Sequence, residues 1–184
     1  MDIKKKLNIG CGRDVKTGWL NLDSAALPGV DVVYDIAKLP LPFPDEEFDE
    51  ILAQDVLEHM NDYMPALRDL HRILKKDGTI TIRLPHFTSK NNFIDPTHRR
   101  LFSVNTFDFF VKNTKFHKER GYYFDFAFER IALLRLTFDK NLRLFYNRPL
   151  EWFFNLSPHL QSFYESTGLS RAFPAENIVI TLVK

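Results

Sequence analysis

The chain has 184 residues, enough for one domain with a sizeable core and too few for two domains of ordinary size. Hydrophobic residues make up 45% and charged residues 27%, which excludes a disordered or collagen-like chain. The net charge of +1 gives no global attraction to nucleic acid, and the single cysteine excludes an intramolecular disulfide.

No apolar run approaches the roughly 20 residues of a membrane span. The basic N-terminus is followed by Gly10 and Gly12, not by the apolar core of a signal peptide. We therefore expect a cytoplasmic protein without a membrane span.

Short apolar runs predict four strands in the first third of the chain. They cover residues 6–9, 19–22, 30–34 and 48–53. The three prolines within 39–44 exclude a helix there. Residues 64–74 carry apolar side chains at helical spacing, with Lys75-Lys76 suited to the helix C-terminus and Asp77-Gly78 ending it. A fifth strand is predicted over 79–84.

Phenylalanine is concentrated in the middle of the chain, where 15 of the 18 lie between residues 87 and 163. Residues 86–130 lack a clean periodicity, so we expect an inserted segment over the sheet, with a helical turn or two at 107–111. A phenylalanine core is the simplest interpretation. The alternatives are an aromatic roof over an acceptor pocket or an association surface for a homodimer.

The last part of the chain predicts two more strands and one helix. Residues 131–138 alternate as a strand does, and 142–146 could pair with them through a turn. Residues 149–166 predict a helix that is interrupted or kinked at Pro158 and capped by Gly168.

Residues 177–183 predict the last strand. Strands that alternate with helices or crossovers indicate an α/β fold with a mostly parallel, covered sheet. We expect a single domain over 1–184.

Ligands of such sheets bind at the carboxyl ends of the strands. Gly10-Cys11-Gly12 follows the first strand, where glycine lets the backbone approach a ligand. Asp23 ends the second strand and could accept both hydroxyls of a ribose, and Asp35 ends the third and could accept an amino group of a base. As alternatives to ligand binding, the glycines could form an ordinary turn, and the two aspartates could cap turns or helices. The three features together indicate a ligand site more specifically than any one of them does. Gln54-Asp55 and His86 end the next two strands.

Five segments carry a family resemblance: LNIGCG, GWLNLD, YDIAKLPLPFPDEEFDEI, VLEHM and LHRILKKDGTITI. They resemble the class I S-adenosylmethionine-dependent methyltransferases, most nearly the type 11 group, over about residues 6–84. The tail FPAENIVITLVK is similar to the family's final strand. The resemblance implies a Rossmann-like, seven-stranded, mostly parallel sheet with an antiparallel last strand. It also implies S-adenosyl-L-methionine as cofactor and S-adenosylhomocysteine as product.

The same resemblance assigns the strand ends. Gly10 and Gly12 would line the methionine part of the cofactor, Asp23 would bind the ribose hydroxyls, and Asp35 the adenine amino group. Gln54 would face the methionine or the acceptor. Their neighbours complete the candidate cofactor-binding set: Asn8, Cys11, Ser24 and Ile36.

The chain departs from the family in its first loop. Arg13-Asp14 stands where a third glycine is common, and Asn8 where an acid is usual. Only ten residues separate Gly12 from Asp23, so the first crossover helix must be one turn or absent. Trp19 could replace a cofactor wall near the sulfonium, where a ring face attracts a cation, or it could pack under the loop.

Methyl transfer needs a base only when the acceptor is a hydroxyl or a protonated nitrogen. The catalytic candidates are His98, His86 and His59, although His59 could simply pack at a helix start. Asp95, Arg99 and Arg100 share a proline-containing loop with His98 and are candidates for binding the acceptor. A solvated loop is the alternative. We expect no metal, because His86, Asp95 and His98 match no ligand spacing.

The sequence thus predicts a methyltransferase for a small-molecule or conjugate acceptor. A non-catalytic S-adenosylmethionine-binding partner subunit is an alternative that the short first loop supports. An RNA methyltransferase is another, because residues 112–123 mix cations with aromatics. The small net charge disfavours it, as does the sequence Ala53-Gln54-Asp55 where an amino-base methyltransferase carries N/D-P-P-Y/F.

Overall fold

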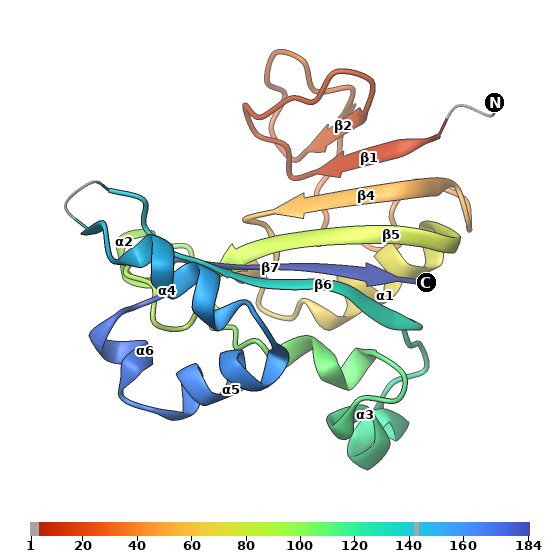
Figure 1. Ribbon diagram of the computed structural model, residues 1–184. Coiled ribbons are helices and arrows are strands. Elements are labelled where there is room, and N and C mark those ends of the chain that lie inside the picture. Colours follow the sequence, from red (N-terminus) through yellow and green to blue (C-terminus); the bar gives the residue numbers. More distant parts are fainter. Residues whose placement is uncertain (1–3, 142–143) are drawn as a thin grey trace.

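The computed structural model describes residues 4–141 and 144–184. Seven strands form one sheet in the order β3-β2-β1-β4-β5-β7-β6 (Figure 1). The strands are β1 (Lys6–Ile9), β2 (Leu20–Asp23), β3 (Val32–Val33), β4 (Phe48–Gln54), β5 (Leu74–Pro85), β6 (Arg130–Thr137) and β7 (Asn177–Val183). The pairs among β1 to β5 are parallel, and β7 lies antiparallel between β5 and β6. This confirms the predicted α/β fold with an antiparallel last strand.

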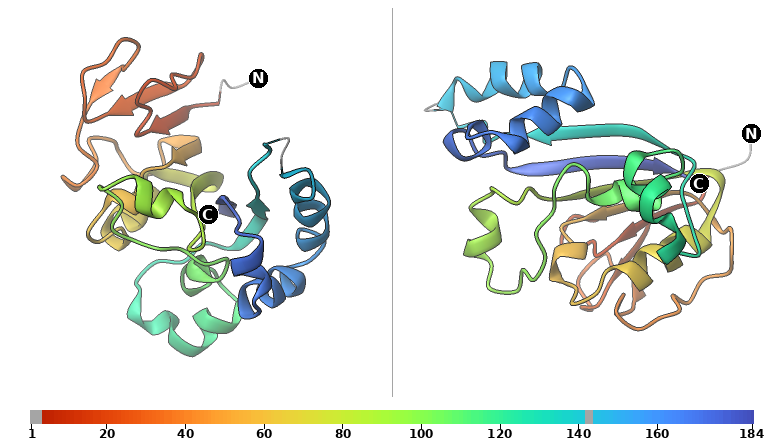
Figure 2. Two further views of the ribbon diagram at one scale, coloured as in Figure 1. Left: turned by 90° about the vertical axis from the view of Figure 1, so that its left-hand side faces the viewer. Right: turned by 90° about the horizontal axis from the view of Figure 1, so that it is seen from below.

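Most of the helices lie in the second half of the chain. They are α1 (Met64–Ile73), α2 (Asn91–Ile94), α3 (Lys115–Arg120), α4 (Asn147–Phe154), α5 (Pro158–Ser166) and α6 (Leu169–Ala172), with 3-10 turns η1 (Leu57–His59), η2 (Thr106–Phe110) and η3 (Gly121–Tyr123). Figure 2 shows α4 and α5 on one side of the sheet and α1 on the other. The described residues between β1 and β2 form turns without a helix, as the ten-residue spacing predicts.

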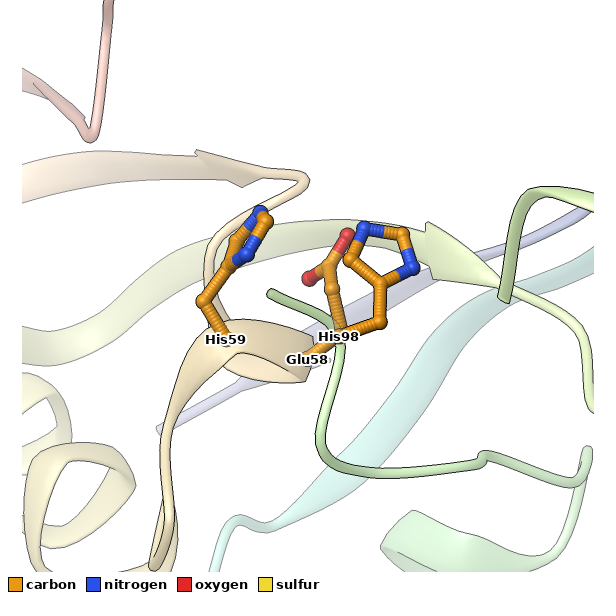
Figure 3. Close-up of side chains that lie close together, drawn as sticks. All are labelled: Glu58, His59 and His98. Atoms are coloured by element: carbon orange, nitrogen blue, oxygen red, sulfur yellow. The ribbon is translucent and has the colours of Figure 1, made fainter. Parts of the chain in front are cut away.

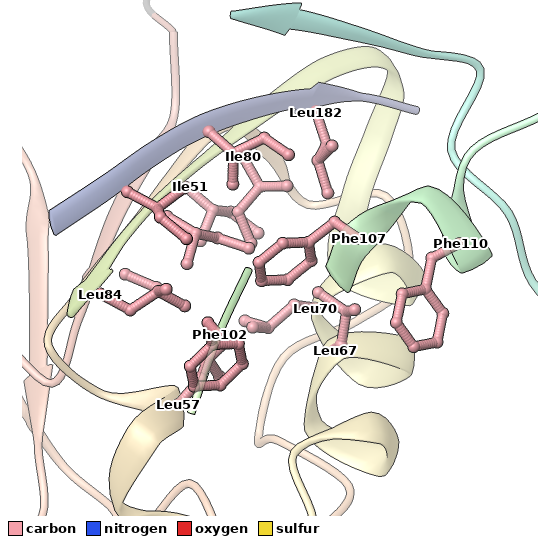
Figure 4. Packing of buried hydrophobic residues seen from close by; sticks show 14 of the residues in the cluster. Ile51, Leu57, Leu67, Leu70, Ile80, Leu84, Phe102, Phe107, Phe110 and Leu182 are labelled. Carbon is pink, nitrogen blue, oxygen red and sulfur yellow. The ribbon is translucent and has the colours of Figure 1, made fainter. Parts of the chain in front are cut away.

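The main core lies on the α1 face of the sheet. The apolar stripe of α1 is fully buried there, and alternate residues of β5 and β7, such as Ile80 and Ile180, point to the same side. Phe102, Phe107 and Phe110 of the segment between β5 and β6 complete this layer (Figure 4). Several phenylalanines of the aromatic segment are therefore core residues, the simplest of the predicted roles.

The opposite face carries a row of paired residues that runs from β1 to β6. The register aligns them across the sheet as Asn8, Leu52, Thr81, Thr181 and Leu133. Leu52 and both threonines are partly exposed, and the threonine hydroxyls lie 3.0 Å apart. Figure 1 shows no helix over β1, β4 and β5 on this side of the described chain. The described helices therefore leave one face of β1, β4 and β5 uncovered, which corrects the expectation of a covered sheet.

The boundary between α1 and β5 differs from the prediction. α1 ends at Ile73, and Leu74 already has extended backbone and pairs with Phe48. Asp77-Gly78 therefore does not end the helix. It lies within β5, where the amide of Asp77 and the carbonyl of Gly78 bond to Lys184.

The elements after β6 also differ. Residues 142–143 of the predicted partner strand lie outside the described residues, and 144–146 form turns. The predicted helix over 149–166 is two helices, because Asn155–Ser157 interrupts it and Ser157 caps α5 through the amide of Leu160. Gly168 precedes α6 and does not cap α5, which ends at Ser166 with Thr167 as its C-cap.

His71 gives this fold a pH dependence that can be measured. Its ring packs against Phe126 and Phe128 at centroid distances of 5.5 and 5.0 Å, and burial lowers the pKa of His71 to about 4. An unfolded histidine titrates near 6.5, so below that pH the unfolded state binds a proton that the folded state does not.

Stability should therefore fall as the pH drops from about 6.5 towards 4. Urea unfolding of the wild type and His71→Gln at several pH values should show a shallower decline in the variant. If the stability of the wild type and that of the variant declined equally with pH, His71 would not be a source of this pH dependence. This comparison holds even if other groups titrate in the same range.

Candidate functional site

A cavity of about 360 Å³ lies at the carboxyl ends of β1, β2 and β4, where a parallel sheet binds its ligands. Its wall is lined by Gly10, Leu22, Asp23, Ser24, Tyr34, Asp35, Ile36, Ala37, Asp55, Val56, His59 and Met60. Gly10, Asp23, Ser24, Asp35 and Ile36 are among the residues that the sequence predicts for cofactor binding. The chain thus brings three separate strand ends to one hollow.

Gly10 is required at the floor of this cavity. Its backbone has φ of +63°, and a Cβ placed there would lie 2.3 Å from Cγ2 of Val56. Both the left-handed backbone and the close approach favour glycine. The loop after β1 can therefore lie directly against the segment after β4 and leave space above it.

The two predicted aspartates hold the loops that frame the cavity. Asp23 accepts the amide of Gly12 at 2.7 Å on Oδ2 and that of Ala25 at 2.9 Å on Oδ1. Asp35 accepts the amide of Ala37 at 2.9 Å on Oδ1. Each carboxylate oxygen has two acceptor sites, so these capping bonds leave acceptor capacity for a ligand. The capping and binding interpretations of the sequence are therefore compatible.

Five predicted cofactor residues do not line the cavity: Asn8, Cys11, Gly12, Trp19 and Gln54. Asn8 is buried and donates to Asn21 and to the carbonyl of Asp14, which fixes the short first loop. The ammonium group of Lys6 lies over the Trp19 ring, with Nζ 5.2 Å from the ring centroid. Gln54 is the last residue of β4 and is not part of this lining, whereas its neighbour Asp55 is.

A second cavity, of about 530 Å³, adjoins the first. It is lined by Asp55, Glu58, His59, Arg83, Pro85, Asn91, Ile94, Asp95, His98, Glu176 and Asn177. Asp55 and His59 belong to both walls, and Asp55 forms an ion pair with Arg83. The described lining of this cavity contains no phenylalanine. The nearby phenylalanines Phe102 and Phe107 are buried in the core instead.

Glu58 is the most unusual residue of the second cavity. Its side chain is fully buried, and neither carboxylate oxygen has a hydrogen-bond partner. Burial raises the pKa of Glu58 to about 8. Figure 3 shows its carboxyl group between the rings of His59 and His98, whose centroids are 4.8 Å apart. The fold therefore places a buried carboxyl group that lacks hydrogen-bond partners beside two imidazoles.

The hydrogen bonds around His59 define its tautomer. The hydroxyl of Thr97 donates to Oδ1 of Asp95 at 2.6 Å, so it can only accept from Nδ1 of His59, at 2.8 Å. Nδ1 of His59 therefore carries a proton, and in the neutral ring the free electron pair is on Nε2. His98, with a side chain only 8% exposed, has its Nε2 3.8 Å from Oδ2 of Asp95, and its Nδ1 has no partner.

The third predicted histidine is placed elsewhere. His86 is fully buried, and its ring nitrogens bond to Thr88 at 2.7 Å and to Glu165 at 2.9 Å. It lines neither cavity, and both nitrogens are engaged, so its role is to fasten the segment after β5 to α5. Proximity to a strand end alone could not distinguish this role from catalysis.

Arg99 and Arg100 also lie outside both cavity walls. The amide of Arg99 donates to the carbonyl of Glu58 at 2.8 Å, and its Nη1 donates to Asn61 at 2.9 Å. Arg100 donates to the carbonyl of Asn61. Both residues join the loop after β5 to the loop after β4, and in this way they position His98 beside Glu58.

Sequence comparison finds relatives for the first half of the chain. Residues 7–82 match a family model described as a methyltransferase domain. A demethylmenaquinone methyltransferase of Listeria welshimeri is 35% identical over 66 residues, which are 36% of this chain and 28% of that protein. The chain thus spans little more than a quarter of the length of this curated relative.

Structural comparison extends the similarity to nearly the whole chain. A SAM-dependent methyltransferase from Archaeoglobus fulgidus superposes with a TM-score of 0.59 and 18% identity, over 98% of this chain and 86% of the other. A SAM-dependent methyltransferase from Thermotoga maritima, described as a possible histamine N-methyltransferase, gives 0.57 and 18%, over 100% and 84%. At these identities the likeness establishes the fold. Among the described residues, every helix is too short or too polar to cross a membrane.

Proposed function

We propose, on the premise that this chain belongs to the class I S-adenosylmethionine-dependent methyltransferases, that it transfers a methyl group to an acceptor in the second cavity. One observation carries the proposal: the cavity at the predicted cofactor residues and the polar cavity beside it share Asp55 and His59. A cofactor in the first cavity would then have its acceptor as a direct neighbour. The acceptor is a small molecule or a conjugate.

The first cavity fits S-adenosylmethionine in three respects. Its volume of about 360 Å³ lies within the range of small-molecule sites. Asp23 retains acceptor capacity for the ribose hydroxyls, and Asp35 for the adenine amino group. Gly10 leaves room above the loop for the methionine part. Bound S-adenosylmethionine supplies a methyl group already activated on a sulfonium.

The residues of the chain then have three tasks. The loop after β1 orients the methionine part, the wall between the cavities aligns acceptor and sulfur, and the fit of the bound ligands to the cavities excludes water. For a hydroxyl acceptor, His59 lies at the boundary between the two cavities, and Thr97 fixes the orientation of its ring through Nδ1. His98 and Asp95 line the acceptor side. His86 is omitted from this catalytic set.

The alternatives have less support. α3 carries much of the basic and aromatic stretch and lies at the lower right of Figure 1, whereas β1, β4 and β5 end at the left. This separation does not favour an RNA acceptor. The exposed tyrosines 122 and 123 stay candidates for a homodimer surface. The buried, unpaired Cys11 accords with a reducing cytoplasmic location.

Calorimetric titration with S-adenosylhomocysteine tests the proposal. The wild type should bind it, and Asp23→Ala should weaken binding by about 1–3 kcal/mol, the cost of losing hydrogen bonds to a charged group. Asp14→Ala is the matched control, since Asp14 is an exposed acid in the loop between β1 and β2 that pairs with Lys16. Absence of both binding and a thermal shift at millimolar S-adenosylhomocysteine would refute the proposal.

A further inference from the structure

We propose that Glu58, His59 and His98 bind a divalent transition-metal ion at the boundary of the two cavities. Within residues 4–141 and 144–184, they are the one group of three or more His, Cys, Asp or Glu side chains placed to share an ion. One ligand atom from each lies within 4.8 Å of the other two. Figure 3 shows the carboxyl group of Glu58 between the two rings.

The contacts of Glu58 give an independent reason for an ion. Its fully buried oxygens have no hydrogen-bond donor in the described structure, and a buried carboxyl group without a hydrogen-bond partner is unfavourable whether it is ionised or neutral. The ligand atoms of the two imidazoles lie within 4.8 Å, but neither ring hydrogen-bonds to Glu58. An ion held at roughly 2.0–2.2 Å from each donor would bridge these gaps after small side-chain rotations.

The second layer of contacts already orients one ligand. Thr97 accepts the Nδ1 proton of His59 and donates to Asp95, so Nε2 of His59 is the nitrogen left for a metal. Metal-bound histidines commonly use their other nitrogen in this way. Asp95, 3.8 Å from Nε2 of His98, adds a second negative charge to balance a divalent cation.

The donor set also indicates the class of metal. Two imidazoles and a carboxylate suit zinc, iron, cobalt or manganese better than calcium or magnesium, which prefer oxygen ligands. Three protein ligands leave a coordination position open, and the second cavity lies on that side. The expected occupant of this position is an oxygen or nitrogen of the acceptor. That role rests on the proposed function, whereas the ion site does not.

Cobalt titration of the EDTA-treated full chain tests the site, with visible absorption and equilibrium dialysis as readouts. The wild type should bind one equivalent of Co²⁺, which Zn²⁺ displaces. Mutation of a residue that only hydrogen-bonds to a metal ligand commonly lowers metal affinity by about 10–100-fold. Loss of a direct ligand should lower it by at least as much. His98→Gln and Glu58→Gln should therefore each weaken binding by about 100-fold or more, while His159→Gln on the exposed side of α5 should not.

The outcomes separate this proposal from the proposed function. Absence of saturable Co²⁺ binding, or equal binding in wild type and His98→Gln, overturns the metal site. Thermal unfolding of both variants shows whether each one folds. If Glu58→Gln does not fold, the result for His98→Gln alone tests the metal site. S-adenosylhomocysteine binding without Co²⁺ binding overturns only the metal site. Co²⁺ binding without S-adenosylhomocysteine binding overturns only the methyltransferase proposal.

Discussion

His98→Asn should lower turnover by about 100-fold or more and leave the affinity for S-adenosylhomocysteine nearly unchanged. His98 lines the second cavity and not the first, so its removal should affect the acceptor side alone. A loss of this size is typical when a group that moves a proton or holds the reacting atom is removed. His59 is a poorer test residue, because it borders both cavities.

Turnover is measured as S-adenosylhomocysteine formation, with an acceptor found by screening small molecules, and cofactor affinity by calorimetry. His159→Asn is the control, because it makes the same change at an exposed histidine. A loss confined to the KM of the acceptor would make His98 a positioning residue. Unchanged kinetics would remove it from the site.

Glu165→Ala should lower the free energy of unfolding by about 3–5 kcal/mol, the range for breaking a buried pair. Glu165 accepts three hydrogen bonds, from His86 at 2.9 Å, Ser103 at 2.6 Å and the amide of Val104 at 2.8 Å. The variant leaves all three donors without this partner, and unsatisfied buried groups cost about 1–3 kcal/mol each. For a chain of this length, the melting temperature should fall by roughly 10 °C.

Glu119→Ala is the control for this change, because Glu119 is an exposed acid on α3. Glu165→Gln should retain part of the stability, since its amide oxygen can still accept a hydrogen bond. If Glu165→Ala unfolds at the wild-type temperature, α5 does not fasten the segment that carries His98. The measurement therefore also tests how the acceptor cavity is held in place.

The sheet could be predicted from the sequence because its signals are local. The run over 6–9 and the last run over 177–183 are strands with those bounds. The short spacing between Gly12 and Asp23 is sufficient to predict a missing crossover helix. The α1 boundary could not be predicted, because tertiary pairing of Leu74 with Phe48 overrides the helix-ending signal of Asp77-Gly78.

The acceptor side could be predicted only in part. His59, Asp95 and His98 are conspicuous in the sequence, and the structure brings all three to one cavity. Glu58 gives no such signal, because a glutamate beside a histidine is ordinary until its burial is known. His86 shows the opposite case. Its place at a strand end predicts function, but Glu165, 79 residues away in the chain, engages its ring.

The uncovered face of β1, β4 and β5 bears on how the molecule opens. β2 and β3 have four and two residues, and they lie at the edge of the sheet farthest from β6. Such an edge can open locally without global unfolding, and its amides would exchange with solvent first. Asp23 and Asp35 follow these strands, so a ligand bound there would hold the edge closed by mass action. Ligand binding in the first cavity and local opening of this edge are then linked equilibria, so that each shifts the other.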